Sequence, residues 1–198
     1  MAVRGFWSPY RSHRMDRDDI VKYSVTERLR DQRPVTIRAI RPDDKGLIIE
    51  LLSEVSAESL YRRLFTTKKV FTADDLKQIT DVDFANVVAL VAVLEKDGND
   101  HIMGGGRYIR SGPSGNEQRA EVAFLVDDAF QGLGIASCIF KHLIMIARES
   151  GIRQFEAEVL PSNEAMLKVF TRSGIPVTKR ATCDSVHILM DLTGEDKQ

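Results

Sequence analysis

The chain has 198 residues, of which 43% are hydrophobic and 29% charged, a composition typical of folded globular proteins that excludes disordered and fibrous classes. The formal net charge of -1 provides no overall basic field, so nucleic acid is not an expected partner. The longest apolar runs are far shorter than the roughly 20 residues that cross a bilayer, so no membrane partner is expected either.

Residues 1–20 mix Arg, Asp, Ser and Pro without a steady periodicity, which predicts a flexible N-terminal tail. They contain no continuous apolar core and no small-residue cleavage site, so we expect a cytoplasmic protein. The pattern changes near Tyr23, and we therefore expect one domain over residues 21–192, followed by a short tail over 193–198.

In the first half of this domain, segments with alternating apolar and polar residues precede segments with helical spacing. Residues 23–29 and 35–40 alternate apolar and polar side chains, which predicts two paired strands. The Pro-Asp-Asp at 42–44 ends the second strand and precedes apolar residues on helical spacing. Residues 58–65 and 72–80 predict two further short helices, the second with a Thr-x-x-Asp cap.

The second half carries most of the predicted strands. The turn sequence KDGND separates residues 85–95 from 101–109, which predicts a hairpin. Further segments follow in the order strand, helix, strand, helix and two last strands, with the first four at 119–126, 134–150, 154–160 and 163–173. This order predicts a mixed α/β (α+β) fold, with helices covering a central sheet, rather than a doubly wound parallel sheet.

A glycine-rich turn, Gln131-Gly132-Leu133-Gly134-Ile135-Ala136, joins the strand at 119–126 to the following helix. A helix that begins there presents unpaired backbone N–H groups and the positive end of its dipole, which together favour an anion such as phosphate. The turn is neither a Walker A loop nor a dinucleotide fingerprint, so a different phosphate site is indicated.

At this turn the sequence resembles the GNAT superfamily of N-acetyltransferases, whose acetyl-CoA motif is Q/R-x-x-G-x-G/A. The resemblance extends over residues 35–190. The segments RPVTIRAIRPDD, ESLYRRLF and EVAFLVDDAFQGLGIA are similar to the bacterial protein lysine acetyltransferase (Pat-type) branch. The resemblance implies the GNAT fold, a mostly antiparallel twisted sheet with splayed strands.

The resemblance also implies an acetyl-CoA site. The backbone of Phe124, Leu125 and Val126 would pair with the pantetheine amides and supply an oxyanion donor. Asn163 would contact the cofactor arm. The pyrophosphate would lie against the turn and the first helical residues, namely Gln131, Gly132, Leu133, Gly134, Ile135, Ala136 and Ser137.

Glu121 is the residue that the resemblance indicates as the general base. Its neighbours on the same strand face, Ala123 and Leu125, are apolar, and such surroundings strengthen a carboxylate as a base. The alternative is a structural glutamate paired with Arg107 or Arg119. Phe170 stands where many relatives have a tyrosine as general acid, and it lies on an apolar stripe typical of a core position.

The expected activity is therefore direct transfer of an acetyl group from acetyl-CoA to a primary amine. A protein lysine side chain is the preferred acceptor, with a small-molecule amine as one alternative and a catalytically weak acyl-CoA sensor as another. A homodimer is possible from the family resemblance. Cys138, Cys183 and the four histidines match no zinc spacing, so no metal is expected.

Overall fold

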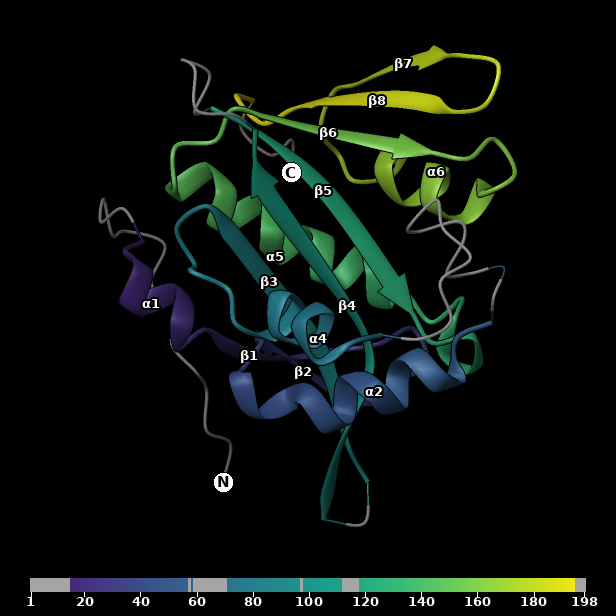
Figure 1. The fold of residues 1–198 in the computed structure, drawn as a ribbon. Helices are drawn as coiled ribbons and strands as arrows, with labels where there is room; N and C mark the ends of the chain where they lie inside the picture. The colour runs from purple at the N-terminus through teal and green to yellow at the C-terminus, as the bar shows by residue number, and fades with distance from the viewer. Residues whose placement is uncertain (1–14, 57, 59–70, 97, 112–117, 195–198) are drawn as a thin grey trace.

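The structure is a computed structural model that describes residues 15–56, 58, 71–96, 98–111 and 118–194 (Figure 1). The helix predicted at 58–65 lies almost entirely outside the described residues. Among the described residues, no helix is long and apolar enough to cross a membrane.

An eight-stranded sheet forms the centre of the molecule in the order β1-β2-β3-β4-β5-β6-β8-β7. All neighbouring strands are antiparallel except β5 and β6, so the predicted mixed and mostly antiparallel fold is confirmed. The strands are β1 Ser24–Arg28, β2 Pro34–Ala39, β3 Val87–Lys96, β4 Asn99–Arg110, β5 Arg119–Val126, β6 Gln154–Val159, β7 Val177–Ala181 and β8 Val186–Asp191.

Helices cover both faces of this sheet (Figure 1). The long helix α5 lies behind it, while α2 and α4 lie in front. Because residues on a strand alternate between faces, the even-numbered side chains of β5 point toward α5 and the odd-numbered ones toward α2. The helices are α1 Arg17–Val21, α2 Lys45–Glu54, α4 Ala73–Thr80, α5 Ile135–Glu149 and α6 Glu164–Thr171, with short 3-10 turns at Pro42–Asp44 and Asp128–Phe130.

The sheet opens between β5 and β6. These strands pair in parallel only at Arg119, Ala120 and Glu121, which face residues 154–156. Beyond Glu121 the two strands diverge toward α6 (Figure 1). The edge of β5 from Val122 to Val126 therefore keeps its pairing with β4 but, within the part of the chain that the structure describes, has no strand partner on the β6 side.

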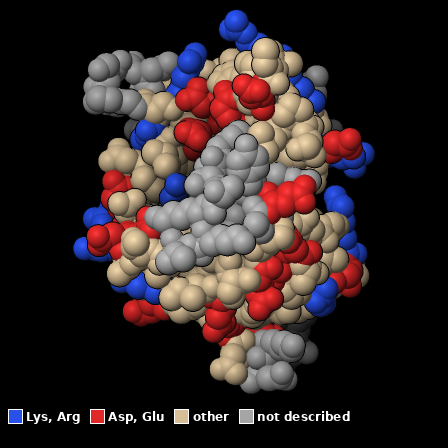
Figure 2. Space-filling model, turned by 45° about the vertical axis from the view of Figure 1, so that its right-hand side comes forward, with Lys and Arg blue, Asp and Glu red and all other residues tan. Residues whose placement is uncertain are grey.

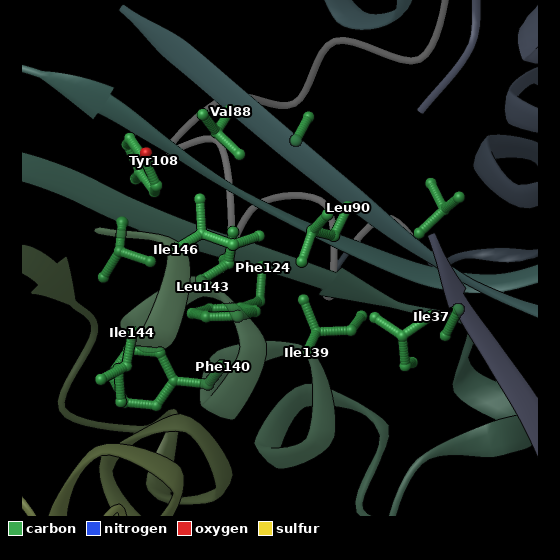
Figure 3. Close-up of a cluster of buried hydrophobic side chains, with 14 of the residues drawn as sticks. Ile37, Val88, Leu90, Tyr108, Phe124, Ile139, Phe140, Leu143, Ile144 and Ile146 are labelled. Carbon is green, nitrogen blue, oxygen red and sulfur yellow. The ribbon is translucent and has the colours of Figure 1, made fainter. Parts of the chain in front are cut away.

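The main core lies between the sheet and α5 (Figure 3). The ring of Phe124 packs edge-on against Phe140, with centroids 5.5 Å apart. A side chain at Gly106 would meet this ring, because an added Cβ would lie 2.6 Å from the Cδ1 atom of Phe124. Tyr108 is fully buried in the same core, so it is a packing residue.

The ordered domain begins earlier than predicted. Asp16 caps α1 by accepting a hydrogen bond from the backbone N–H of Asp19, and Ile20 is only 2% exposed. Residues 16–20 therefore belong to the domain and not to the predicted tail over 1–20. A single turn of helix with one buried apolar side chain is too short to show a periodicity, which explains the difference.

Candidate active site

A cavity of about 740 Å³ occupies the opening between β5 and β6. It is bordered by β5, the glycine turn, the first turn of α5, β6 and α6. Every predicted site residue except Leu133 lines it, namely Glu121, Phe124, Leu125, Val126, Gln131, Gly132, Gly134, Ile135, Ala136, Ser137 and Asn163. Residues far apart in the sequence, such as Glu121 and Asn163, therefore line the same cavity.

The glycine turn presents backbone N–H groups to this cavity. Gly132 and Gly134 have φ angles of 81° and 91°, a left-handed conformation that L side chains rarely adopt. The N–H of Cys138 donates to the carbonyl of Gly134 at 2.9 Å in the first turn of α5. The N–H groups from Ile135 to Ser137 precede this bond and have no partner within the helix.

Two aspartates fix the loop that precedes the turn. Asp127 is 3% exposed, and its backbone N–H donates to the carbonyl of Met103 at 3.0 Å. Asp128 accepts from the side-chain amide of Gln131 at 2.6 Å and from the backbone N–H of Ser56 at 3.0 Å. These bonds hold the turn against the end of β4 and the segment after α2, so its N–H groups have a fixed direction.

Arg30, from the loop between β1 and β2, also holds the turn. Its Nη1 donates to the carbonyl of Gly132 at 3.0 Å, and its backbone N–H donates to the carbonyl of Leu133 at 3.1 Å. Leu133 therefore anchors the turn to β1 and β2 instead of lining the cavity. Arg30 itself lines the cavity and adds a positive charge beside the turn.

Sequence analysis did not identify Arg30 because it lies about 100 positions before the motif. Two more basic residues line the cavity from α6, Lys168 and Arg172. The sequence did contain a signal for these two residues. They are four positions apart in a predicted helix, and residues at that spacing lie on one helix face. The cavity wall is therefore more basic than the motif alone indicates.

Glu121 lies where the opening begins, opposite Ile109 on β4 and Glu156 on β6. Its side chain is exposed, so it is not enclosed by the apolar surroundings expected for it. Arg107 lies on the same strand face. Burial lowers the pKa of the Arg107 guanidinium, and the nearby charge of Glu121 opposes that change.

The predicted alternative for Glu121 was a structural ion pair with Arg107 or Arg119. Among the described residues, no ion pair within 4.0 Å joins Glu121 to either arginine. The charge of Glu121 acts on Arg107 from a greater distance. The carboxylate therefore remains accessible to the cavity that it lines.

Two further carboxylates follow Glu121 on this face of the opening. Glu156 accepts a hydrogen bond from the hydroxyl of Ser111 at 2.8 Å. Glu158 lies 2.6 Å from the Nδ1 of His187 and accepts from Ser185 at 2.7 Å. Figure 2 shows acidic side chains gathered on the face that carries α2 and α4, with basic side chains mostly at its margins. This face is suited to a cationic molecule.

The far wall of the cavity is formed by α6. Asn163 caps this helix, because its Oδ1 accepts from the backbone N–H of Met166 at 3.2 Å. Phe170 is 1% exposed. The centroid of its ring lies 6.0 Å from the ring centroid of Phe124 and 5.3 Å from that of Phe140. Phe170 is thus a core side chain without a proton to donate, in agreement with its apolar pattern.

A second, smaller hollow of about 120 Å³ lies on the other side of β5, beneath α2 and α4. It is lined mainly by apolar side chains. Arg107, Ala123 and Leu125 line both hollows, so these three residues lie between the two.

Comparison with known proteins agrees with this geometry. A sequence model described as the acetyltransferase (GNAT) family matches residues 55–175. The acetyltransferase Pat of Mycolicibacterium smegmatis is 35% identical over 138 residues, which cover 70% of this chain but only 40% of that protein.

Two solved structures have similar folds. The GNAT domain of S. lividans PAT superposes with a TM-score of 0.76 at 36% identity, covering 85% of this chain and 96% of that one. The protein yncA from Salmonella typhimurium, solved with its cofactor acetyl-CoA, superposes with a TM-score of 0.65 at 19% identity, covering 81% and 95%. At that identity the likeness to yncA concerns the fold alone. The matching family model and the splayed sheet show that this chain belongs to the acetyltransferase (GNAT) family.

Proposed function

We propose that this protein transfers the acetyl group of acetyl-CoA to a primary amine, with a protein lysine side chain as the preferred acceptor. One observation carries the proposal. A single cavity joins the N–H groups of the glycine turn to the carboxylate of Glu121. Phosphate binding at one end and base catalysis at the other are the two requirements of this reaction.

The residues of the glycine turn suit the pyrophosphate of CoA. The N–H groups from Ile135 to Ser137 point out of the start of α5, where the helix dipole favours negative charge. Arg30 lies beside the turn, and Lys168 and Arg172 line the α6 wall. Bound acetyl-CoA supplies an activated acyl group as a thioester, and the chain has only to orient that group.

The unpaired edge of β5 supplies the orientation. From Val122 to Val126 every other residue directs its backbone N–H and C=O groups into the opening, because the other edge pairs with β4 and pairing with β6 ends at Glu121. An extended pantetheine arm has amides that pair with such an edge as an added strand does. A backbone N–H of Phe124, Leu125 or Val126 then stabilises the oxyanion that forms at the thioester carbon.

Glu121 accepts the proton that the acceptor amine must lose. A lysine ammonium has a pKa of about 10.4, so little neutral amine is present at pH 7. The exposed carboxylate of Glu121 takes that proton directly or through one water molecule, a contribution worth about 10²- to 10⁴-fold in rate. Phe170 has no proton to give, so solvent protonates the leaving thiolate.

The acidic face supports a cationic acceptor. Glu121 and Glu158 line the cavity, and Glu156 lies opposite Glu121 where the strands begin to separate. Opposite charge increases the rate at which a lysine-rich protein surface encounters the site. The similarity to Pat-type relatives favours the same class of acceptor.

The test is a thiol-release assay with acetyl-CoA, using a lysine-rich protein pool and a panel of small amines. We expect turnover with proteins. We expect Glu121→Gln to lower kcat by about 10²- to 10⁴-fold while acetyl-CoA binding is retained. Glu95→Gln makes the same chemical change at an exposed position of β3 and should leave both values unchanged.

Other results would change the assignment. Turnover only with one small amine would replace the protein acceptor. Acetyl-CoA binding without turnover of any amine would favour a sensor. No binding of acetyl-CoA would refute the role given to the glycine turn, and an unchanged kcat in Glu121→Gln would refute the role of Glu121.

A further inference from the structure

Three potential metal ligands meet between α5 and the edge strand β1. Cys138 and His142 lie four residues apart on α5, so they share one face of the helix. Glu27 faces them from β1. One ligand atom from each of the three residues lies within 4.8 Å of the other two.

His142 has an unusual environment within this group. It is 5% exposed, and its Nδ1 lies 2.6 Å from the hydroxyl of Tyr23. Its buried Nε2 lies 3.0 Å from Oε1 of Glu27, so the ring nitrogen and the carboxylate point toward one another. The Nε2 atom is therefore directed into the three-residue group.

We infer that Glu27, Cys138 and His142 form a zinc site, with Zn²⁺ bound by the Oε1, Sγ and Nε2 atoms. Thiolate, imidazole and carboxylate are the ligands that Zn²⁺ prefers, and three protein ligands leave a fourth position for water. Sequence spacing did not reveal this site because Glu27 lies more than 100 positions before the other two.

The surroundings of His142 suit this assignment. With Nε2 on the metal, the ring proton lies on Nδ1 and is donated to the Tyr23 hydroxyl, which fixes the tautomer and orientation of the ring as outer-shell bonds do. Lys141 contacts Glu27 Oε1 at 3.0 Å. Its side chain is 72% exposed, so it can move into solvent when the metal binds.

A metal ion at this place would link two elements that are distant in sequence, β1 and the start of α5. Cys138 lies one turn after Gly134, and its backbone N–H donates to the Gly134 carbonyl. Zn²⁺ would therefore join β1 to the part of α5 that supports the glycine turn. Arg30, which follows β1, already contacts the same turn from the other side.

The test uses tag-free protein treated with a chelator and then titrated with Co²⁺, followed by competition with Zn²⁺. We expect one Co²⁺ per chain, with thiolate-to-cobalt charge-transfer absorption that Zn²⁺ removes. Cys138→Ala should abolish that absorption, whereas Cys183→Ala, at an exposed cysteine, should keep it. Glu27→Gln should weaken Zn²⁺ binding by at least about tenfold, since even outer-shell losses reach that size.

Absence of the absorption in the wild-type protein at saturating Co²⁺ would overturn the inference. So would absorption that persists in Cys138→Ala or is lost in Cys183→Ala. Each variant is first checked by circular dichroism, and Zn²⁺ should raise Tm in the wild type but not in Cys138→Ala. These readouts do not involve acetyl transfer, so they stand apart from the proposed activity.

Discussion

Gly106→Ala should destabilise the protein by overpacking the core behind β5. The added Cβ would lie 2.6 Å from Cδ1 of Phe124 and 2.8 Å from Cγ2 of Ile139. Carbon atoms pack best about 3.5–4.0 Å apart, so the Phe124 ring must move by about 1 Å. Phe140 and Phe170 lie against that ring and oppose the movement.

The expected cost is about 1–3 kcal/mol, the usual range for an extra methyl group in a packed core. For a chain of this length, that corresponds to a fall in Tm of roughly 2–12 °C. Urea unfolding followed by circular dichroism measures the free energy of unfolding directly. Because Phe124 belongs to the strand proposed to bind pantetheine, the KM for acetyl-CoA should also rise.

Gly46→Ala is the matched control. Gly46 lies in α2 with nothing within 4 Å of an added Cβ, so the same chemical change should stabilise the protein by about 0.5–1 kcal/mol. Opposite signs for the two variants would support the packing argument. A Gly106→Ala protein as stable as the wild type would show that β4 can move away from α5, and would refute it.

Three further predictions concern stability and the glycine turn. Asp44→Asn should cost about 3–5 kcal/mol of unfolding free energy, because it leaves the Arg38 guanidinium, 2.7 Å away and 5% exposed, charged and buried. The same change at Asp31, in a solvent-screened pair at the surface, should lower the free energy of unfolding far less. Burial alone would raise the pKa of Asp83, but hydrogen bonds from the start of β3 lower it to about 2. Its stabilising contribution is therefore complete above pH about 4 and lost as the pH falls toward 2, so acid titration should close the stability gap between wild type and Asp83→Asn. Gly134→Ala should strain a residue at φ 91° by about 1–2 kcal/mol and weaken acetyl-CoA binding in calorimetry, while Gly134→Asn should have a smaller effect; equal affinities for both variants and wild type would contradict this.

Local patterns were sufficient to predict most elements of the fold. The helix predicted at 134–150 occurs as Ile135–Glu149, and the strand at 119–126 occurs as Arg119–Val126. Both segments have strong apolar periodicity and clear end signals, so their type does not depend on distant contacts. The order of strands in the sheet, in which β8 lies between β6 and β7, depends on such contacts and was not predicted.

The sequence motif indicated which residues to consider for the site, but not how the surrounding layers cover them. The glycine turn and Glu121 line one cavity, while their roles in binding and catalysis stay predictions. The exposure of Glu121 was not foreseen, because alternation along one strand shows which side chains share a face but not whether another layer covers it. At this position the end of the β5–β6 pairing leaves the carboxylate uncovered.

Arg30 illustrates why the glycine turn works as one unit with the edge of the sheet. The turn needs left-handed residues at 132 and 134, and such a backbone forms few hydrogen bonds within itself. Arg30 supplies two of the missing bonds, to the carbonyls of Gly132 and Leu133. Those carbonyls are thereby held toward β1 and β2, and the N–H groups that follow them are left facing the cavity. The direction of the proposed phosphate site is therefore set by a residue about 100 positions away, which a motif of six residues does not contain.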